Sequence, residues 1–160
     1  MDDNLEIAIQ LRKQGQFEES RNVLHALIDA KQDVAQAHLH IAWSYDSQGS
    51  EREAVEHYEL ALFGELSLED RFDALLGLAS TLRSLGQYQK AFTFFEQAVS
   101  EYPSAKQILP FYSMCLYNLG RHKQAITILL NLLIEETDNQ AILDYQSAIK
   151  IYAQDIDKTW

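Results

Sequence analysis

Four glycines recur at nearly constant intervals along this 160-residue chain, and the repeat limits what the chain can fold into. They are separated by 34, 37 and 34 residues. A small residue lies seven positions before each glycine, another lies five after it, and a large apolar residue lies nine after it. Because the same kind of residue recurs at each of these three positions, or columns, around all four glycines, the pattern indicates four copies of one unit. The glycines are Gly15, Gly49, Gly86 and Gly120, and the three columns hold Ala8, Ala42, Ala79 and Ser113, then Ser20, Ala54, Ala91 and Ala125, then Leu24, Tyr58, Phe95 and Leu129.

Each unit is interpreted as two helices that meet at the glycine. Apolar residues on both sides of it are spaced three and four apart, which is the pattern of an amphipathic helix. A glycine at the end of the first helix suits a left-handed cap, where a Cβ atom is penalised. The small columns allow two antiparallel helices to approach closely. Because such a hairpin cannot bury its apolar face alone, we expect the hairpins to stack.

The third copy resembles the tetratricopeptide repeat (TPR) family, whose pattern is W-x2-L-G-x2-Y, then A-x3-F, then P. The resemblance covers residues 2–139 and implies an all-α fold, a right-handed α-solenoid of four hairpins at about 2–34, 35–68, 72–105 and 106–139. A C-terminal capping helix then occupies 140–160. The matching residues of the third copy are Leu75, Leu78, Ala79, Leu82, Gly86, Tyr88, Ala91, Phe95, Ala98 and Pro103.

Two prolines and six glycines are too few for the frequent turns of an all-β fold, which leaves a helical one. Between the second and third hairpins, Gly64 ends one helix and Ser67 caps the next, with Asp70 three positions later. Pro110 predicts a kink or a late helix start. The expected helices are 3–14, 18–31, 35–48, 51–63, 69–85, 88–101, 105–119, 122–136 and 140–156, and the ninth carries the apolar stripe Ile142, Tyr145, Ile149, Tyr152 and Ile156.

Charge and composition exclude several functions. The net charge of −11 disfavours binding to nucleic acid or to an anionic membrane. The N-terminus has no basic region of the kind found in signal peptides, and no apolar run is long enough to span a membrane. A single cysteine suits a reducing compartment, so we expect a cytoplasmic protein. Sixteen acids and six bases lie at or before Asp73, which indicates either a solvated acidic surface or attraction of a basic partner.

No set of residues predicts an enzyme, a cofactor site or a metal site. His38 and His40 are two positions apart, so they lie on different faces of a helix, whereas zinc ligands on a helix prefer three- or four-residue spacing. We expect His38 to be a packing residue. Cys115 has no second cysteine and no basic neighbour, which favours a buried, inert thiol. Phosphate-binding glycine loops and the HExxH motif are absent from the sequence.

The TPR resemblance implies a binding surface instead, because the first helix of each hairpin faces a concave groove in that family. The lining positions carry mostly apolar and aromatic residues, so we expect a non-enzymatic module that binds a peptide, a basic segment or an amphipathic helix. A homodimer that covers the groove or the ninth helix is the alternative. The groove candidates are Leu5, Ile9, Arg12, Leu39, Trp43, Leu76, Ser80, Arg83, Phe111, Met114 and Tyr117.

Overall fold

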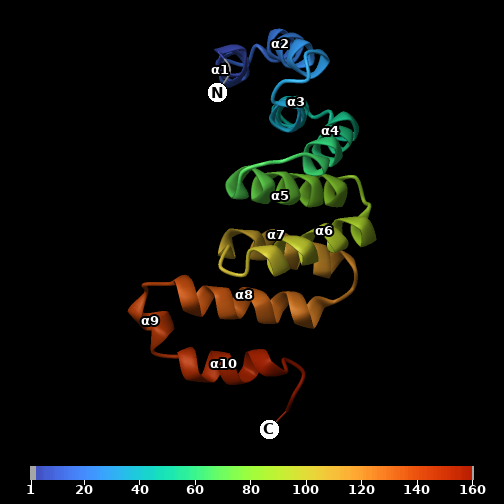
Figure 1. Cartoon of the computed structure of the whole chain (residues 1–160). Helices are drawn as coiled ribbons and strands as arrows, with labels where there is room; N and C mark the ends of the chain where they lie inside the picture. The colour runs from blue at the N-terminus through green and yellow to red at the C-terminus, as the bar shows by residue number, and fades with distance from the viewer. Residues whose placement is uncertain (1–2, 160) are drawn as a thin grey trace. The chain divides into compact units, whose positions relative to one another are not determined.

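The computed structural model describes residues 3–159, and these residues form ten α-helices and one 3₁₀ turn, with no strand (Figure 1). They fall into two compact units, of which unit 1 ends at Ala98 and unit 2 begins at Val99. The elements are α1 (Asp3–Lys13), α2 (Phe17–Asp29), α3 (Val34–Ser47), α4 (Glu51–Phe63), α5 (Leu68–Ser84), α6 (Tyr88–Glu101), η1 (Lys106–Ile108), α7 (Leu109–Asn118), α8 (His122–Glu136), α9 (Gln140–Leu143) and α10 (Gln146–Gln154). The prediction of an all-helical hairpin repeat is confirmed.

All four repeat glycines adopt the predicted left-handed conformation. Their φ angles are +79° at Gly15, +72° at Gly49, +77° at Gly86 and +77° at Gly120. At the first of them, the N–H of Gly15 donates to the carbonyl of Arg12, and the next residue donates to the carbonyl five positions before it. The other three glycines repeat this pattern. Each turn therefore satisfies the last carbonyls of the first helix by backbone atoms alone.

The small columns lie where the two helices of a hairpin touch. In the first hairpin, Ala8 and Ser20 are fully buried, and the Ser20 hydroxyl donates a 2.7 Å hydrogen bond to the Ala8 carbonyl. Serine thus replaces alanine here without leaving a buried hydroxyl unpaired. Ala79 and Ala91 are also fully buried in the third hairpin. The close approach predicted from these columns is therefore confirmed.

Large side chains fill the spaces between hairpins in unit 1. Tyr58 and Phe95 are almost completely buried, as their column predicts. The Tyr58 ring packs directly against Gly77, where an added Cβ atom would lie 2.6 Å from Cζ of the tyrosine. In the fourth copy, by contrast, Leu129 is exposed. The column therefore marks the core in the second and third copies but not in the fourth.

The extra residues between α4 and α5 form the predicted cap. The Ser67 hydroxyl oxygen accepts a 3.0 Å hydrogen bond from the backbone N–H of Asp70 and donates one of 2.8 Å to the Asp70 carboxylate. This reciprocal arrangement satisfies a backbone donor at the start of α5. Gly64 ends α4 in an extended conformation and packs against Ala35, with no room for a Cβ atom.

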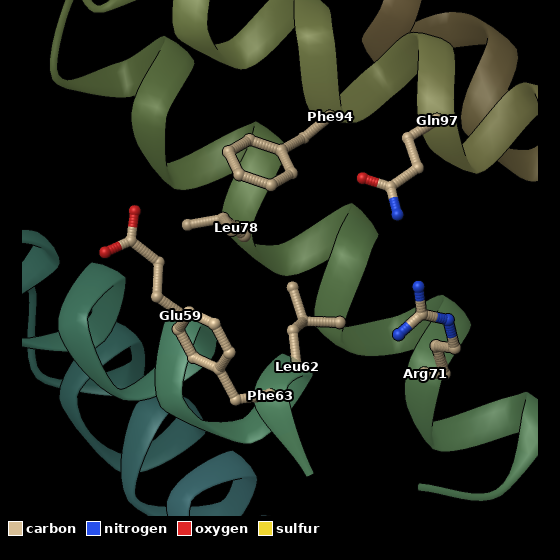
Figure 2. A pocket seen from close by; sticks show the side chains of 7 residues that line it. All are labelled: Glu59, Leu62, Phe63, Arg71, Leu78, Phe94 and Gln97. Atoms are coloured by element: carbon tan, nitrogen blue, oxygen red, sulfur yellow. The ribbon is translucent and has the colours of Figure 1, made fainter. Parts of the chain in front are cut away.

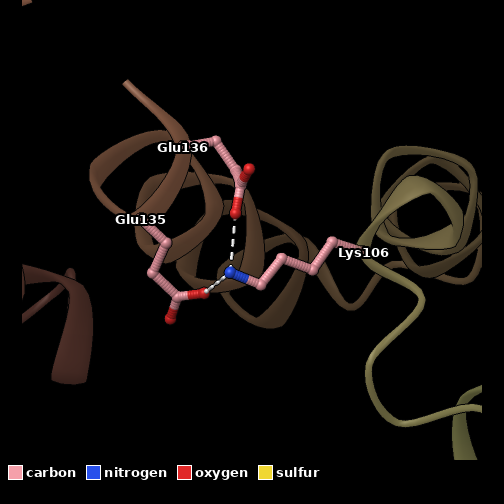
Figure 3. Close-up of polar contacts among 3 residues, drawn as sticks. All are labelled: Lys106, Glu135 and Glu136. Atoms are coloured by element: carbon pink, nitrogen blue, oxygen red, sulfur yellow. Dashed lines mark hydrogen bonds and ion pairs between the residues drawn. The ribbon is translucent and has the colours of Figure 1, made fainter. Parts of the chain in front are cut away.

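In unit 2, Pro110 produces a late start and not a kink. A 3₁₀ turn precedes α7, and Pro110 occupies its first turn, where the missing N–H has no intrahelical partner to lose. The Lys106 ammonium then bridges Glu135 and Glu136 near the end of α8, at 3.0 and 2.6 Å (Figure 3). This pair of contacts ties the start of the α7–α8 hairpin to its end.

The prediction of a single ninth helix over 140–156 is wrong. The structure has a short α9, a break at Asp144 and Tyr145, and then α10. Tyr145 is exposed at the break, so it does not belong to a continuous packed stripe. The break allows α10 to lie on α8, where Ala153 is buried and its carbonyl accepts a 2.7 Å hydrogen bond from the Thr127 hydroxyl. Tertiary packing has overridden the local helical pattern.

Candidate functional site

The structure divides the eleven predicted groove residues between the two units. Leu5, Ile9, Arg12, Leu39, Trp43, Leu76, Ser80 and Arg83 lie on the first helices of unit 1, namely α1, α3 and α5. Phe111, Met114 and Tyr117 lie on α7 of unit 2 and are exposed at a spacing of three residues. Each group is therefore a candidate surface by itself.

Burial contradicts the groove assignment of three of the candidates. Leu5, Ile9 and Leu39 are 1%, 9% and 1% exposed, so they offer almost no surface to a ligand. Leu5 and Ile9 belong to the core cluster that joins α1, α2 and α3. The face of a first helix that lines the groove also packs against the next hairpin. Helical spacing alone therefore does not distinguish a groove residue from a core residue.

Trp43 is the half-buried aromatic centre of the remaining unit 1 residues. The guanidinium carbon of Arg12 lies 5.1 Å from its ring centroid, within the range of a cation–π contact. The His40 ring lies 4.9 Å from it in an edge-on arrangement. Residues of α1 and α3 thus hold the indole in place.

Three polar atoms on successive first helices of unit 1 are buried without partners, and two of the residues that carry them, Arg12 and His40, contact Trp43. Among the described residues, Arg12 Nε, His40 Nδ1 and Ser80 Oγ have no hydrogen-bond partner. Buried groups of this kind are nearly always satisfied in proteins, by water or by a ligand. They come from α1, α3 and α5 respectively. We call Arg12, His40, Trp43 and Ser80 the Trp43 site.

His40 contributes a neutral imidazole to the Trp43 site. It is only 8% exposed, and the sequence pattern places it at the shoulder of the groove. Burial, assisted by the positive charge of Arg12, lowers the pKa of His40 to about 4. The ring therefore offers one donor and one acceptor nitrogen near neutral pH.

Asp46, one helical turn beyond Trp43, has a structural role. Its carboxylate accepts a 2.6 Å hydrogen bond from the Tyr58 hydroxyl and 3.2 Å bonds from the Thr81 hydroxyl. These contacts join α3, α4 and α5 beneath the site. Burial raises the pKa of Asp46, while the two hydrogen bonds oppose that shift. On α5, Leu76 and Arg83 are half-buried and share a helical face with Ser80.

A histidine cluster escaped the sequence analysis. His38 Nδ1 and His57 Nδ1 lie 2.9 Å apart, and the His25 ring centroid is 6.1 Å from that of His57. The three residues come from different helices, so no spacing within one helix identifies them. Burial is the main cause that lowers the pKa of His57 to about 4. No group of three or more potential ligands in the described part of the chain is arranged to hold a metal ion.

Cys115 is buried, as the sequence predicts. No helix among the described residues is both long enough and apolar enough to cross a bilayer. The chain is an array of α-helical hairpins, each closed by a left-handed glycine, and this arrangement defines a helical-repeat protein. The tetratrico peptide repeat family model matches residues 35–156, and the chain belongs to this family.

Known proteins of similar sequence and structure agree with this assignment. The response regulator aspartate phosphatase H of Bacillus subtilis is 39% identical over 82 residues, which are 48% of this chain and 21% of that protein. The chain therefore spans about a fifth of that curated relative. The crystal structure of YrrB, described as a TPR protein with an unusual peptide-binding site, superposes with a TM-score of 0.74 at 19% identity, covering 97% of this chain and 77% of YrrB.

The structure of a mutant form of MamA gives a TM-score of 0.68 at 19% identity, with 94% of this chain and 80% of MamA covered. At this level of identity, the similarity to both structures establishes the fold alone. TPR proteins are in general interaction modules without enzymatic activity. The fold therefore points to protein–protein interaction.

Proposed function

We propose that this chain is a non-enzymatic interaction module, in which the Trp43 site of unit 1 binds a peptide or an amphipathic helix of a partner protein. The observation that carries the proposal is the half-buried indole of Trp43 in contact with Arg12 and His40, both of which keep a buried polar atom without a partner. A peptide brings both of the groups that such a site needs. Its backbone carbonyls and amides satisfy Arg12, His40 and Ser80, while an apolar side chain packs on Trp43.

The site is more polar than the mostly apolar and aromatic groove that the sequence predicts. With Leu5, Ile9 and Leu39 in the core, the accessible lining keeps Trp43 and Leu76 but is otherwise polar. A ligand held here therefore gains specificity from hydrogen bonds and affinity from the indole. A single cysteine, buried in unit 2, supports a reducing location such as the cytoplasm.

A peptide-display selection on the wild-type protein tests the proposal. We expect selected peptides to bind the Trp43→Ala variant at least about 30-fold more weakly in calorimetric titrations, because a central aromatic anchor contributes about 2 kcal/mol or more. Tyr145→Ala, which truncates an exposed aromatic side chain of unit 2, is the matched control and should bind normally. Equal binding by folded Trp43→Ala would refute the proposal.

Self-association is a second candidate, favoured by apolar residues left exposed in unit 2. Ile126, Leu129 and Leu133 lie along α8, and Ile151 and Tyr152 lie on α10. A homodimer through these helices would cover an apolar surface that is otherwise in water. Sedimentation velocity distinguishes the two candidates. A protein that stays monomeric at high concentration rules out this second role, whereas a dimer lost in Leu129→Glu supports it.

A further inference from the structure

Phe63, the last residue of α4, is 89% exposed, which is unusual for a large apolar side chain. Its exposure has a local cause. Gly64 follows it and packs against Ala35, so the chain leaves the helix in an extended conformation and nothing folds back over the ring. Val34 and Leu60 are exposed as well. Both line a hollow together with Phe63.

A cavity of about 400 Å³ lies on one side of Phe63. Its apolar wall consists of Leu62, Phe63, Leu78 and Phe94, contributed by α4, α5 and α6 (Figure 2). The volume is in the range of sites that accept one or two large side chains or a small molecule. At its edge, the Glu59 carboxylate accepts a 2.6 Å hydrogen bond from the Lys90 ammonium, which joins α4 to α6.

A second hollow, of about 540 Å³, is also lined by Phe63. It is lined by Val34, Leu60 and Phe63, with Lys31, Asp33 and Glu65 among its polar neighbours. Of the residues that the structure describes, Phe63 is the one that lines both hollows. A small molecule would fill one of them, whereas a helix with apolar residues one turn apart reaches both. We call Val34, Leu60, Leu62, Phe63 and Phe94 the Phe63 surface.

The charge around the Phe63 surface selects the kind of partner. Asp33, Glu59 and Glu65 line the two hollows together with Lys31 and Arg71, and Glu59 is paired with Lys90, whereas the stretch 1–73 as a whole carries sixteen acids and six bases. The carboxylates are close enough to affect one another, since Glu69 and Asp70 add to the effect of burial in raising the pKa of Asp73. A second copy that presented the same acidic stretch to this surface would be repelled there.

We propose that the Phe63 surface is a second docking site, distinct from the Trp43 site, for a basic amphipathic segment of another protein. Apolar side chains of the segment enter the two hollows beside Phe63. Its lysines and arginines face Glu59, Glu65 and the carboxylates at the start of α5. The apolar contacts hold the partner, and the charges accelerate and orient its approach.

The test uses a synthetic helical peptide of leucines and lysines, with the leucines on one face, and a second peptide in which glutamates replace the lysines. Fluorescence anisotropy measures the binding of each. We expect the lysine peptide to bind wild type at least about tenfold more tightly than the glutamate peptide, and Phe63→Ala to weaken the lysine peptide about tenfold. Glu65→Lys should weaken binding most at low salt.

Two controls keep the proposal separate from the Trp43 site. Trp43→Ala should bind the lysine peptide as wild type does, and Tyr145→Ala shows the effect of truncating an exposed aromatic side chain elsewhere. Because Phe63 is so exposed, its alanine variant should retain the wild-type melting temperature. Unchanged affinity in folded Phe63→Ala, equal binding of both peptides, or a wild-type dimer that Phe63→Ala abolishes would each overturn the proposal.

Discussion

The hydroxyl of Tyr58 donates a 2.6 Å hydrogen bond to the Asp46 carboxylate. This contact joins α4 to α3, the two helices of the second hairpin, and α3 also carries Trp43. Tyr58 is almost fully buried, and Asp46 is half-buried. The tyrosine therefore serves both the core, through its ring, and the support of the Trp43 site, through its oxygen.

Tyr58→Phe should lower the free energy of unfolding by about 1–3 kcal/mol, because the half-buried carboxylate loses a donor and keeps only Thr81. The hydrogen bond from Tyr58 lowers the pKa of Asp46, so its removal should raise that pKa further. Urea unfolding and carboxyl-carbon NMR measure the two effects. Tyr145→Phe, at an exposed tyrosine, is the control and should change neither. If the stability of Tyr58→Phe matches wild type, the contact has no energetic role.

Gly77→Ala should destabilise the protein by about 1–3 kcal/mol, which reverses the effect expected in an ordinary helix. Alanine normally favours a helix over glycine, but here its Cβ atom would lie 2.6 Å from the Tyr58 ring. Thermal unfolding measures the change. Gly86→Ala provides a comparison, since it meets no atom within 4 Å and is strained only by its φ of +77°. A more stable Gly77→Ala variant would show that the ring moves aside freely.

Ala91→Leu should cost about 1–3 kcal/mol by overpacking the contact between α5 and α6. Ala91 is fully buried in the small column that lets the helices approach. Chemical denaturation compares this variant with Ala26→Leu, which places the same side chain at an exposed position of α2. A wild-type midpoint for Ala91→Leu would contradict the tight hairpin contact.

Acidification should destabilise the protein between pH 6.5 and about 4, in part through His40. Its pKa is about 4 in the folded state and 6.5 in the reference state, so the unfolded chain binds more protons across this interval. The stabilisation is complete above pH 6.5 and is lost as the pH falls through 4. His57 acts in the same direction.

His40→Leu should flatten this pH dependence by about 2 kcal/mol between pH 7 and pH 4, as measured by urea unfolding at each pH. Ser47→Ala, which truncates an exposed, non-titrating side chain of α3, is the control and should leave the dependence unchanged. If the free energy of unfolding varied with pH in the same way for wild type and His40→Leu, the pKa of His40 would be the same in the folded and unfolded states.

The sequence predicted the hairpins well because their determinants are local. A left-handed glycine, such as Gly86, and a small residue at a fixed distance from it act on their own turn and their own helix pair. The break at Asp144 was missed because nothing in the local pattern interrupts the helix. It follows from the packing of α10 on α8, where Ala153 is buried.

The candidate site was predicted only in part, for a related reason. Helical periodicity assigned Leu39 and Trp43 to one face, yet the first is in the core and the second is accessible. Which of them remains accessible depends on the neighbouring hairpin. Contacts between helices, such as His38 with His57, have no signature at any fixed spacing. The exposure of Phe63 follows from the path of the chain after Gly64 and not from the position of Phe63 in the repeat.

The four left-handed glycine turns also bear on how such a protein can change its partners. Because backbone atoms alone close each hairpin, the exposed side chains of the first helices carry little of the folding task. Recognition and folding therefore draw on largely separate sets of positions. Substitutions at Ser80 or Leu76 can alter which ligand is preferred while the turns and small-residue contacts persist, so descendants of one ancestral array can diverge in specificity and keep a common architecture.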